Sequence, residues 1–401
     1  MLTMLLPFQV RIQAMDKDMQ ERIAEIISEY TRQGVHRTGT DIDHLSADWL
    51  AQRIKALGVH PSESSFPFKR LQSLQTSLSL SGLDLSGVPL YDCSYTGDKG
   101  ITGSMGDVGS DADIGVAMSL PFDSSESGRI IHVARREGKH KAIVVVTDDR
   151  LPADGVATLN AENYADPFGP PVLQVANKHW PEIQAAMKSS ATGQIIVQCD
   201  YVDATARNIE ARIKGRNPQL APIVIMTPRS GWWTCASERG GGIACLLEMM
   251  RGIKASEPLR DVIFTANTGH ELGHTGSDYF LHNNPQLIKG AHIWVHLGAN
   301  FAAKYGAQVR LQYSDEQAVQ SLAPLLLLNS INPDAQTEMN QRPLGEARNI
   351  YDGGGRYVSI LGGNGLFHHP ADVWPDAVNL DATTKWVSTF VQLGVKLAAS
   401  V

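Results

Sequence analysis

The sequence has few of the features that mark membrane, disulfide-rich or nucleic-acid-binding proteins. It contains no run of about 18 apolar residues, so we expect no segment to span a bilayer. The apolar opening is short and lacks a basic lead, which argues against a signal peptide. The four cysteines form no CxxC pair and indicate reduced thiols of a cytoplasmic protein. The net charge of −7 argues against nucleic acid or an anionic membrane surface as a partner.

What the sequence does contain is typical of a globular protein. Hydrophobic residues make up 43% and charged residues 19%, which is enough for a sizeable core. Residues 18–30 and 46–57 carry apolar side chains at helical spacing. Two amphipathic helices at the start of a chain must cover an apolar surface, most simply the face of a sheet.

The composition changes between Ser73 and Asp203. Glycine, serine and aspartate become frequent, and short β-rich runs occur at 141–147, 171–175 and 194–198. Short strands separated by turn residues are typical of a small, mainly β domain.

After Ala206, strand patterns alternate with helix patterns. The predicted strands are 223–227, 261–266, 291–297, 308–313 and 356–361, and the predicted helices are 242–253, 277–282, one from 315 and one from 383. This order indicates an α/β fold with a mixed, mostly parallel central sheet and helices on both faces. The ligand crevice of such a sheet lies at the carboxyl ends of its strands.

Unusual residues cluster at those strand ends. Arg229, Trp232 and Trp233 follow the first strand and could hold a carboxylate and an apolar group, although packing alone would also explain them. Glu238 precedes three glycines that open a helix, where a carboxylate can reach a metal ion. His296 ends a later strand, a position where a lone histidine is more often a core residue than a ligand.

Residues 270–274 spell HExxH, the zincin pattern of two histidines one helical turn apart with a glutamate that activates water. That pattern requires a helix. Here Gly269 precedes the motif and Gly273 interrupts it. The zincin therefore stays open as an alternative. The last candidates are His368 and His369, two adjacent histidines in a glycine-rich loop that suit metal binding or acid–base work.

Taken in order, these stretches resemble the co-catalytic zinc aminopeptidases, a family that includes bacterial leucyl aminopeptidase, glutamate carboxypeptidase and the transferrin receptor. The family framework is a strand ending in HxD, a helix start DNxSG, then GEELGLxGS, LDM and YHTxxD. The corresponding segments here are TPR at 227–229, ERGGG at 238–242, GHELGHTGS at 269–277, HLG at 296–298 and FHHPAD at 367–372. The resemblance implies the family's fold, and segment 73–203 is similar to the protease-associated insert of many members.

The departures from the family pattern lie at its metal ligands. The replacements are Thr227 and Arg229 for the first-strand His and Asp, Glu238 for the bridging Asp, His270 for the general-base Glu, and His296 for the third-strand Asp. Glu271 and His368 keep the family's ligand identities. Too few carboxylates remain for two dications, so the resemblance implies one divalent ion, most simply zinc, held by Glu271 and His368 with Glu238 and His296.

We therefore predict a metal-dependent hydrolase that cleaves an amide or related C–N bond of a small anionic substrate. His270 and Glu271 would be catalytic, with His270 as proton shuttle, and Arg229, Trp232, Trp233 and His369 would bind the substrate. The alternatives are a non-catalytic binding protein of the same fold and the HExxH zincin. Residues 1–72 and 204–401 would form the catalytic domain, with 73–203 inserted as a lid. The expected partner is a small molecule, and the sequence leaves a homo-oligomer possible.

Overall fold

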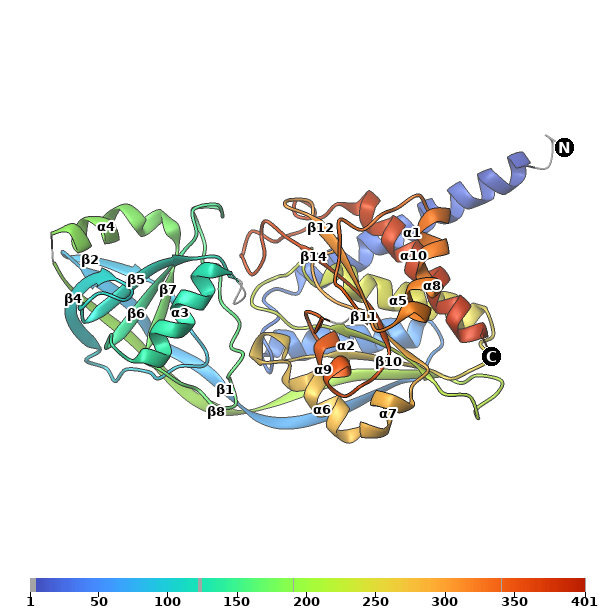
Figure 1. Ribbon diagram of the computed structural model, residues 1–401, viewed down its shortest axis with the longest axis horizontal. Coiled ribbons are helices and arrows are strands. Elements are labelled where there is room, and N and C mark those ends of the chain that lie inside the picture. Colours follow the sequence, from blue (N-terminus) through green and yellow to red (C-terminus); the bar gives the residue numbers. More distant parts are fainter. Residues whose placement is uncertain (1–4, 122–124, 190, 340, 401) are drawn as a thin grey trace.

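Two long antiparallel strands run through the molecule and join two lobes. The computed structural model describes residues 5–121, 125–189, 191–339 and 341–400. Strand β1 (Pro61–Leu80) pairs with β8 (Thr192–Ile213), with one irregularity between Ser73 and Gln75. In Figure 1 this ribbon passes from the right-hand lobe into the left-hand lobe, and one sheet continues through both.

The sheet of the right-hand lobe is mixed and mostly parallel. Its strand order is β13-β12-β14-β11-β9-β10-β8. The four parallel strands are β9 (Ile223–Pro228), β10 (Val262–Asn267), β11 (Ile293–Leu297) and β14 (Tyr357–Gly363). At the edge, β12 (Gln308–Tyr313) is antiparallel to β14 and pairs with the short β13 (Ala335–Gln336). The predicted fold class is confirmed.

Helices cover both faces of this sheet (Figure 1). One face carries α1 (Leu5–Arg32), α2 (Asp41–Ala56), α5 (Gly240–Ala255), α8 (Glu316–Leu328) and α10 (Leu380–Ala399). The other carries α6 (Thr275–Asn283), α7 (Pro285–Gly290) and α9 (Ala347–Asp352). In β9, Ile223 and Ile225 pack on the first side, and Val224 and Met226 on the second. A strand buried on both faces is apolar throughout, which is why its sequence predicts it.

Helix α5 begins two residues earlier than its apolar pattern predicted, at Gly240. This start leaves Arg239 at the N-cap position and Glu238 just before it. Gly242 lies close to the end of β11, because a Cβ atom there would meet the carbonyl oxygens of Leu297 and Gly298. The glycine run thus lets α5 approach the sheet closely and carries Glu238 and Arg239 to the carboxyl ends of the strands.

The left-hand lobe has its own apolar core on a smaller sheet. Its elements are β2 (Leu83–Ser86), β3 (Val88–Pro89), β4 (Ile101–Asp107), β5 (Ile114–Ser119), α3 (Glu126–Glu137), β6 (Ala142–Thr147), β7 (Val172–Val175), η1 (Asn177–His179) and α4 (Trp180–Lys188). Strands β4 to β7 are parallel neighbours. The predicted boundaries at Ser73 and Asp203 fall inside the continuous strands β1 and β8. An inserted, protease-associated-like domain stays a prediction.

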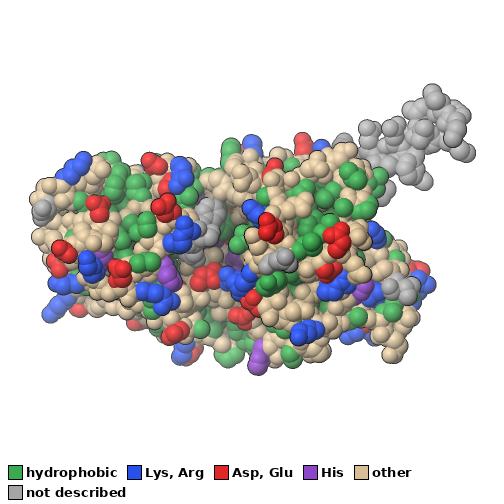
Figure 2. All heavy atoms as spheres, in the orientation of Figure 1, with side chains coloured by type: hydrophobic (Ala, Val, Ile, Leu, Met, Phe, Trp, Pro, Cys, Tyr) green, Lys and Arg blue, Asp and Glu red, His purple; other side chains and the backbone are tan. Residues whose placement is uncertain are grey.

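None of the described helices is both long and apolar enough to cross a bilayer. On the face shown in Figure 2, Lys and Arg side chains are interspersed with Asp and Glu over both lobes.

Candidate active site

The candidate site lies where the sequence places it, at the carboxyl ends of the parallel strands. Six buried polar side chains come together from the segments that follow these strands. They are Glu238 and Arg239 before α5, His270 in the short 3-10 helix η2 (His270–Leu272), His296 at the end of β11, Glu346 before α9 and His368 after β14. Of these, Arg239 and Glu346 were given no role by the sequence analysis.

Glu238, Arg239 and His368 form the first group. Nη2 of Arg239 is 2.7 Å from Oε1 of Glu238, and Nε2 of His368 is 3.5 Å from the same oxygen. The other ring nitrogen of His368, Nδ1, lies 2.8 Å from the carbonyl oxygen of Thr158. Burial would raise the pKa of Glu238, but Arg239 and then His368 outweigh burial and lower this pKa to about 2.

Asp372 holds this first group in place. Its carboxylate accepts hydrogen bonds from the backbone N–H groups of Ser237 and Glu238, at 2.8 and 3.0 Å. Burial is the largest influence on its carboxyl and raises the pKa of Asp372 to about 7. The Asp of the predicted FHHPAD segment therefore positions the Glu238 backbone.

Glu346 is the centre of the second group. Its Oε1 lies 3.5 Å from Nδ1 of His270, and its Oε2 lies 3.8 Å from Nε2 of His296. Neither oxygen accepts a hydrogen bond from any described residue, and the two facing ring nitrogens also lack such a partner there. Nδ1 of His296 contacts Oγ of Ser359 at 2.8 Å. Burial raises the pKa of Glu346 to about 8 and lowers that of His296 to about 3.

Glu271 does not join either group, so its predicted place as a metal ligand is corrected. Its Oε1 accepts hydrogen bonds from the backbone N–H and the hydroxyl of Thr38, at 2.8 and 2.7 Å. Its Oε2 accepts one from Oγ of Ser230 at 2.6 Å. Both oxygens are thus satisfied by the segment before α2 and the loop after β9, and the side chain serves to fix that junction.

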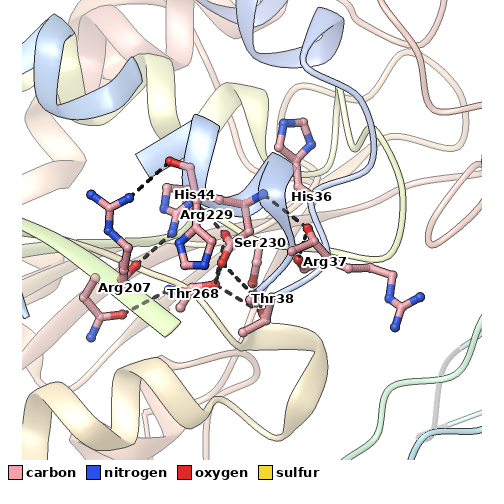
Figure 3. A network of polar contacts seen from close by, with 12 residues as sticks. His36, Arg37, Thr38, His44, Arg207, Arg229, Ser230 and Thr268 are labelled. Atoms are coloured by element: carbon pink, nitrogen blue, oxygen red, sulfur yellow. Dashed lines mark hydrogen bonds and ion pairs between the residues drawn. The ribbon is translucent and has the colours of Figure 1, made fainter. Parts of the chain in front are cut away.

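Arg229 also lies outside the crevice, so its predicted contact with substrate is corrected. It is fully buried, and its Nη1 is 2.8 Å from Oδ1 of Asp43. The guanidinium also donates to the carbonyl oxygens of Asp43 and Arg207 (Figure 3). A charge paired in this way inside the protein holds α2 against β8 and is unavailable to a ligand.

Trp232, Trp233 and His369 form hydrogen bonds with protein groups near the site. Nε1 of Trp232 donates to Oδ1 of Asn160 at 3.1 Å, and Nε1 of Trp233 donates to the carbonyl oxygen of His368 at 2.9 Å. His369 is buried and accepts a hydrogen bond at Nδ1 from the Ala371 N–H. None of these three side chains is among the described residues that line the crevice cavity, and their direct contact with substrate stays a prediction.

A cavity of about 380 Å³ lies between the two lobes and is bounded in part by His270 and His296, the two histidines that face Glu346. It is lined by Pro121, Asn160, Glu162, His270, His274, His296, Gly298, Ala299, Asn300, Leu344, Gly345, Arg348, Leu361, Gly362 and Phe367. Nη2 of Arg348 is 2.6 Å from Oε2 of Glu162 at its rim. A larger groove of about 830 Å³ runs past Phe66 and Tyr279, but it includes none of the six site residues. We therefore take the smaller cavity as the substrate pocket.

The HExxH segment does not form a zincin site. Only His270, Glu271 and Leu272 are helical, and His274 has a positive φ of 67°. The rings of His270 and His274 stack with centroids 4.7 Å apart, and Nδ1 of His274 lies 3.3 Å from Oδ1 of Asn349. Glu271 faces Thr38 and Ser230 instead. The glycines that interrupt the motif therefore exclude the zincin arrangement of its ligands.

The four ligands predicted from the sequence do not surround one point. Glu238 contacts His368, whereas His296 contacts Glu346 and Glu271 is turned away. Throughout the described ranges, no three His, Cys, Asp or Glu side chains are close enough to count as a ready-made metal site. The residues thus do not fit a two-ion centre. The arrangement that most resembles a one-ion site is Glu346 with His270 and His296.

Residues 211–326 match the family model described as peptidase family M28. A zinc aminopeptidase from Bacillus subtilis has a similar structure, with a TM-score of 0.77 and 15% identity over 95% of each chain. A peptidase M28 precursor from Shewanella amazonensis has a TM-score of 0.75 and 15% identity over 97% of each chain. An aminopeptidase from Aneurinibacillus sp. has a TM-score of 0.68 and 15% identity over 95% of this chain and 94% of its own.

No curated protein matches the chain in sequence. The resemblance to the zinc aminopeptidases that was expected from the sequence is confirmed for the fold. The chain has the fold of the zinc aminopeptidases, and its segment 211–326 is similar to peptidase family M28.

Proposed function

We propose that the protein is a metal-dependent hydrolase that cleaves an amide or related C–N bond of a small substrate, with one divalent ion bound beside Glu346. One observation carries the proposal. A fully buried carboxylate faces two histidine nitrogens, and none of these atoms has a hydrogen-bond partner among the described residues. Buried polar atoms are rarely left unpaired, and several unpaired ligand-type atoms facing each other favour a bound cation.

The atom spacing supports the same ion. Two ligands of a tetrahedral zinc with bonds of about 2.0–2.1 Å lie about 3.3–3.4 Å apart. The Glu346 contacts with His270 and His296 are 3.5 and 3.8 Å, each to a different carboxylate oxygen, so each pair lies within about half an ångström of that spacing. Ser359 fixes the other ring nitrogen of His296, as outer partners of metal-binding histidines do. The proposed ligands are therefore Glu346, His270 and His296. Of the ligands predicted from the sequence, His296 is retained, and His270 becomes a ligand where the sequence analysis had made it the proton shuttle.

Two of the side chains that would hold the ion, His270 and His296, line the pocket. A bound divalent ion supplies Lewis acidity to the scissile carbonyl and to the attacking water. His274 is the remaining pocket histidine that can move a proton. Its ring stacks on His270 and its Nδ1 faces Asn349, so its orientation is set by the fold. Burial, and then Arg348, lower the pKa of His274 well below its ordinary value, which keeps the ring neutral.

The pocket also supports a choice of substrate. Its volume suits a small molecule or one terminal residue, and Leu344, Leu361 and Phe367 offer an apolar wall. Because Arg229 is paired inside the protein, the proposed anionic group of the substrate is assigned to Arg348 at the rim. Arg348 is partly exposed and paired with Glu162, so a substrate carboxylate can compete for it. A cytoplasmic location and a small-molecule partner stay proposals.

Elemental analysis of protein prepared without chelator tests the proposal, together with assays on aminoacyl anilides and on N-acyl amino acids. We expect about one equivalent of a divalent ion per chain and hydrolysis of the N-acyl amino acids, which bear a carboxylate. Glu346→Gln should bind the ion at least about 100-fold more weakly, whereas the matched control Glu162→Gln should keep it. Unmutated protein with neither ion nor hydrolysis would support a non-catalytic binding protein. Two equivalents would restore a two-ion centre.

A further inference from the structure

Arg239 places a permanent positive charge next to Glu238 in the site. Its side chain is fully buried, and its Nε donates to the carbonyl oxygen of Ser230 at 2.8 Å. Its Nη2 pairs with Glu238, and neither terminal nitrogen has a further hydrogen-bond partner among the described residues. A guanidinium cannot lose its proton in a protein, so this charge is present at every pH at which the protein is folded.

The charge of Arg239 reaches both groups of the site. It helps to lower the pKa of Glu238 and opposes the rise in the pKa of Glu346 that burial causes. It also contributes, after burial, to the lowered pKa values of His270 and His296. Among the candidate ligands, the contact of Arg239 is with Glu238, at 2.7 Å.

We propose that Arg239 takes the place of a metal ion at Glu238 and His368, and so limits ion binding to the Glu346 side. The carboxylate of Glu238 already has a cation at 2.7 Å, and His368 faces the same oxygen at 3.5 Å. A dication at that oxygen would meet a like charge at contact distance with one carboxylate to share between them. The proposal rests on the proposed function only in placing the single ion beside Glu346.

Removal of the guanidinium tests the proposal. In Arg239→Met, Glu238 is left as an unpaired buried charge next to a free His368 nitrogen. We expect a lower Tm than for the unmutated protein, a larger gain in Tm on adding zinc, and a rise in bound zinc from about one toward about two equivalents. Arg239→Lys keeps a cation and should show none of these three changes.

A double variant decides whether the extra zinc binds at the place that the guanidinium leaves. Glu238→Gln/Arg239→Met should lose the extra zinc and the extra gain in Tm, because the carboxylate that attracts the ion is gone. Equal zinc responses in Arg239→Met and the unmutated protein would overturn the proposal.

Should Arg239→Met not fold, His368→Gln in the otherwise unmutated protein gives the answer. It should retain its zinc content, and loss of the ion would show that His368 holds an ion beside Arg239.

The outcomes also separate this proposal from the proposed function. If unmutated protein binds no ion, the Glu346 site fails, yet a Glu238-dependent gain in Tm of Arg239→Met with zinc would still support the role of Arg239. If unmutated protein binds one ion that Glu346→Gln loses, and Arg239→Met gains nothing, the Arg239 proposal fails alone.

Discussion

Nδ1 of His270 lies 3.5 Å from Oε1 of Glu346, and this contact joins the connection after β10 to the segment before α9. The second oxygen of Glu346 faces His296 at the end of β11. Strands β10 and β11 flank β9 in the sheet, so one carboxylate reaches histidines from both sides of the central strand. The centre of the site is therefore Glu346, and Glu238 belongs to a separate pair with Arg239.

The histidines of the HExxH segment should behave differently from each other. His270→Ala removes a proposed ligand and should weaken ion binding by about 100-fold or more, whereas His274→Ala should keep the ion and lose turnover. Ion titration of the two purified variants, beside a hydrolysis assay, checks this. Loss of the ion in His274→Ala with retention in His270→Ala would contradict the assignment.

The Arg229–Asp43 ion pair should matter for stability and not for substrate choice. Asp43→Asn leaves a buried guanidinium uncompensated and should lower the free energy of unfolding by about 3–5 kcal/mol. Glu162→Gln breaks the partly exposed pair with Arg348 and should cost less than about 1 kcal/mol. Urea denaturation of both variants measures the difference. Similar losses in the two would show that Arg229 is not held as the structure indicates.

Arg348 should set a preference for acidic substrates. Loss of one charge-assisted hydrogen bond of about 1.5–3 kcal/mol predicts that Arg348→Ala raises KM about 10-fold or more for a carboxylate-bearing amide, with little change for a neutral one. Arg342→Ala is the matched control, since Arg342 pairs with Asp352 outside the pocket. Equal effects of the two variants on the acidic substrate would refute this preference.

His36 should make the protein less stable as the pH falls. Burial, and then the charge of Arg229, lower the pKa of His36 from the ordinary 6.5 to about 3. Between these values the unfolded chain takes up a proton that the folded chain does not, so the free energy of unfolding falls by up to about 1.4 kcal/mol per pH unit from this group. His36→Phe keeps the stacking on Tyr30 and removes the titration.

Urea denaturation across that pH window compares the two proteins. His36→Phe should lose less stability than the unmutated protein on acidification. Parallel stability curves would mean that His36 does not stay neutral in the folded state.

Segment 73–203 is predicted to behave as a separable lid. Limited proteolysis should cut first near its edges or between Gly97 and Gly109, which are exposed on either side of β4. The continuous ladder of β1 and β8 favours the second place, because a paired strand resists cleavage. Digestion of the whole chain without a stable intermediate would argue against a separable lid.

The sequence predicted the sheet well because its strands are locally encoded. In β9, residues facing both helix layers are apolar, so the run 223–227 indicates a buried strand without knowledge of its neighbours. The position of the crevice followed from the alternation of strands and helices alone. His296 and His368 were found for the same reason, since each follows a predictable strand.

The ligand set could not be predicted because it depends on partners distant in the sequence. Glu271 keeps a ligand's identity, yet Thr38 and Ser230 occupy both its oxygens. Nothing in the stretch Leu344-Gly345-Glu346-Ala347 indicates that its carboxylate is buried among histidines. Arg239 directly follows Glu238 at the start of the glycine-rich stretch. This positive charge next to Glu238 was the one sequence feature that could have indicated their ion pair.

Anomalous diffraction at the zinc edge, from crystals of protein prepared without chelator, tests whether a single ion binds beside Glu346. We expect one anomalous peak among Glu346, His270 and His296, with the guanidinium of Arg239 still paired to Glu238. A peak on Glu238 and His368, or zinc-supplemented crystals without any peak beside Glu346, would contradict it.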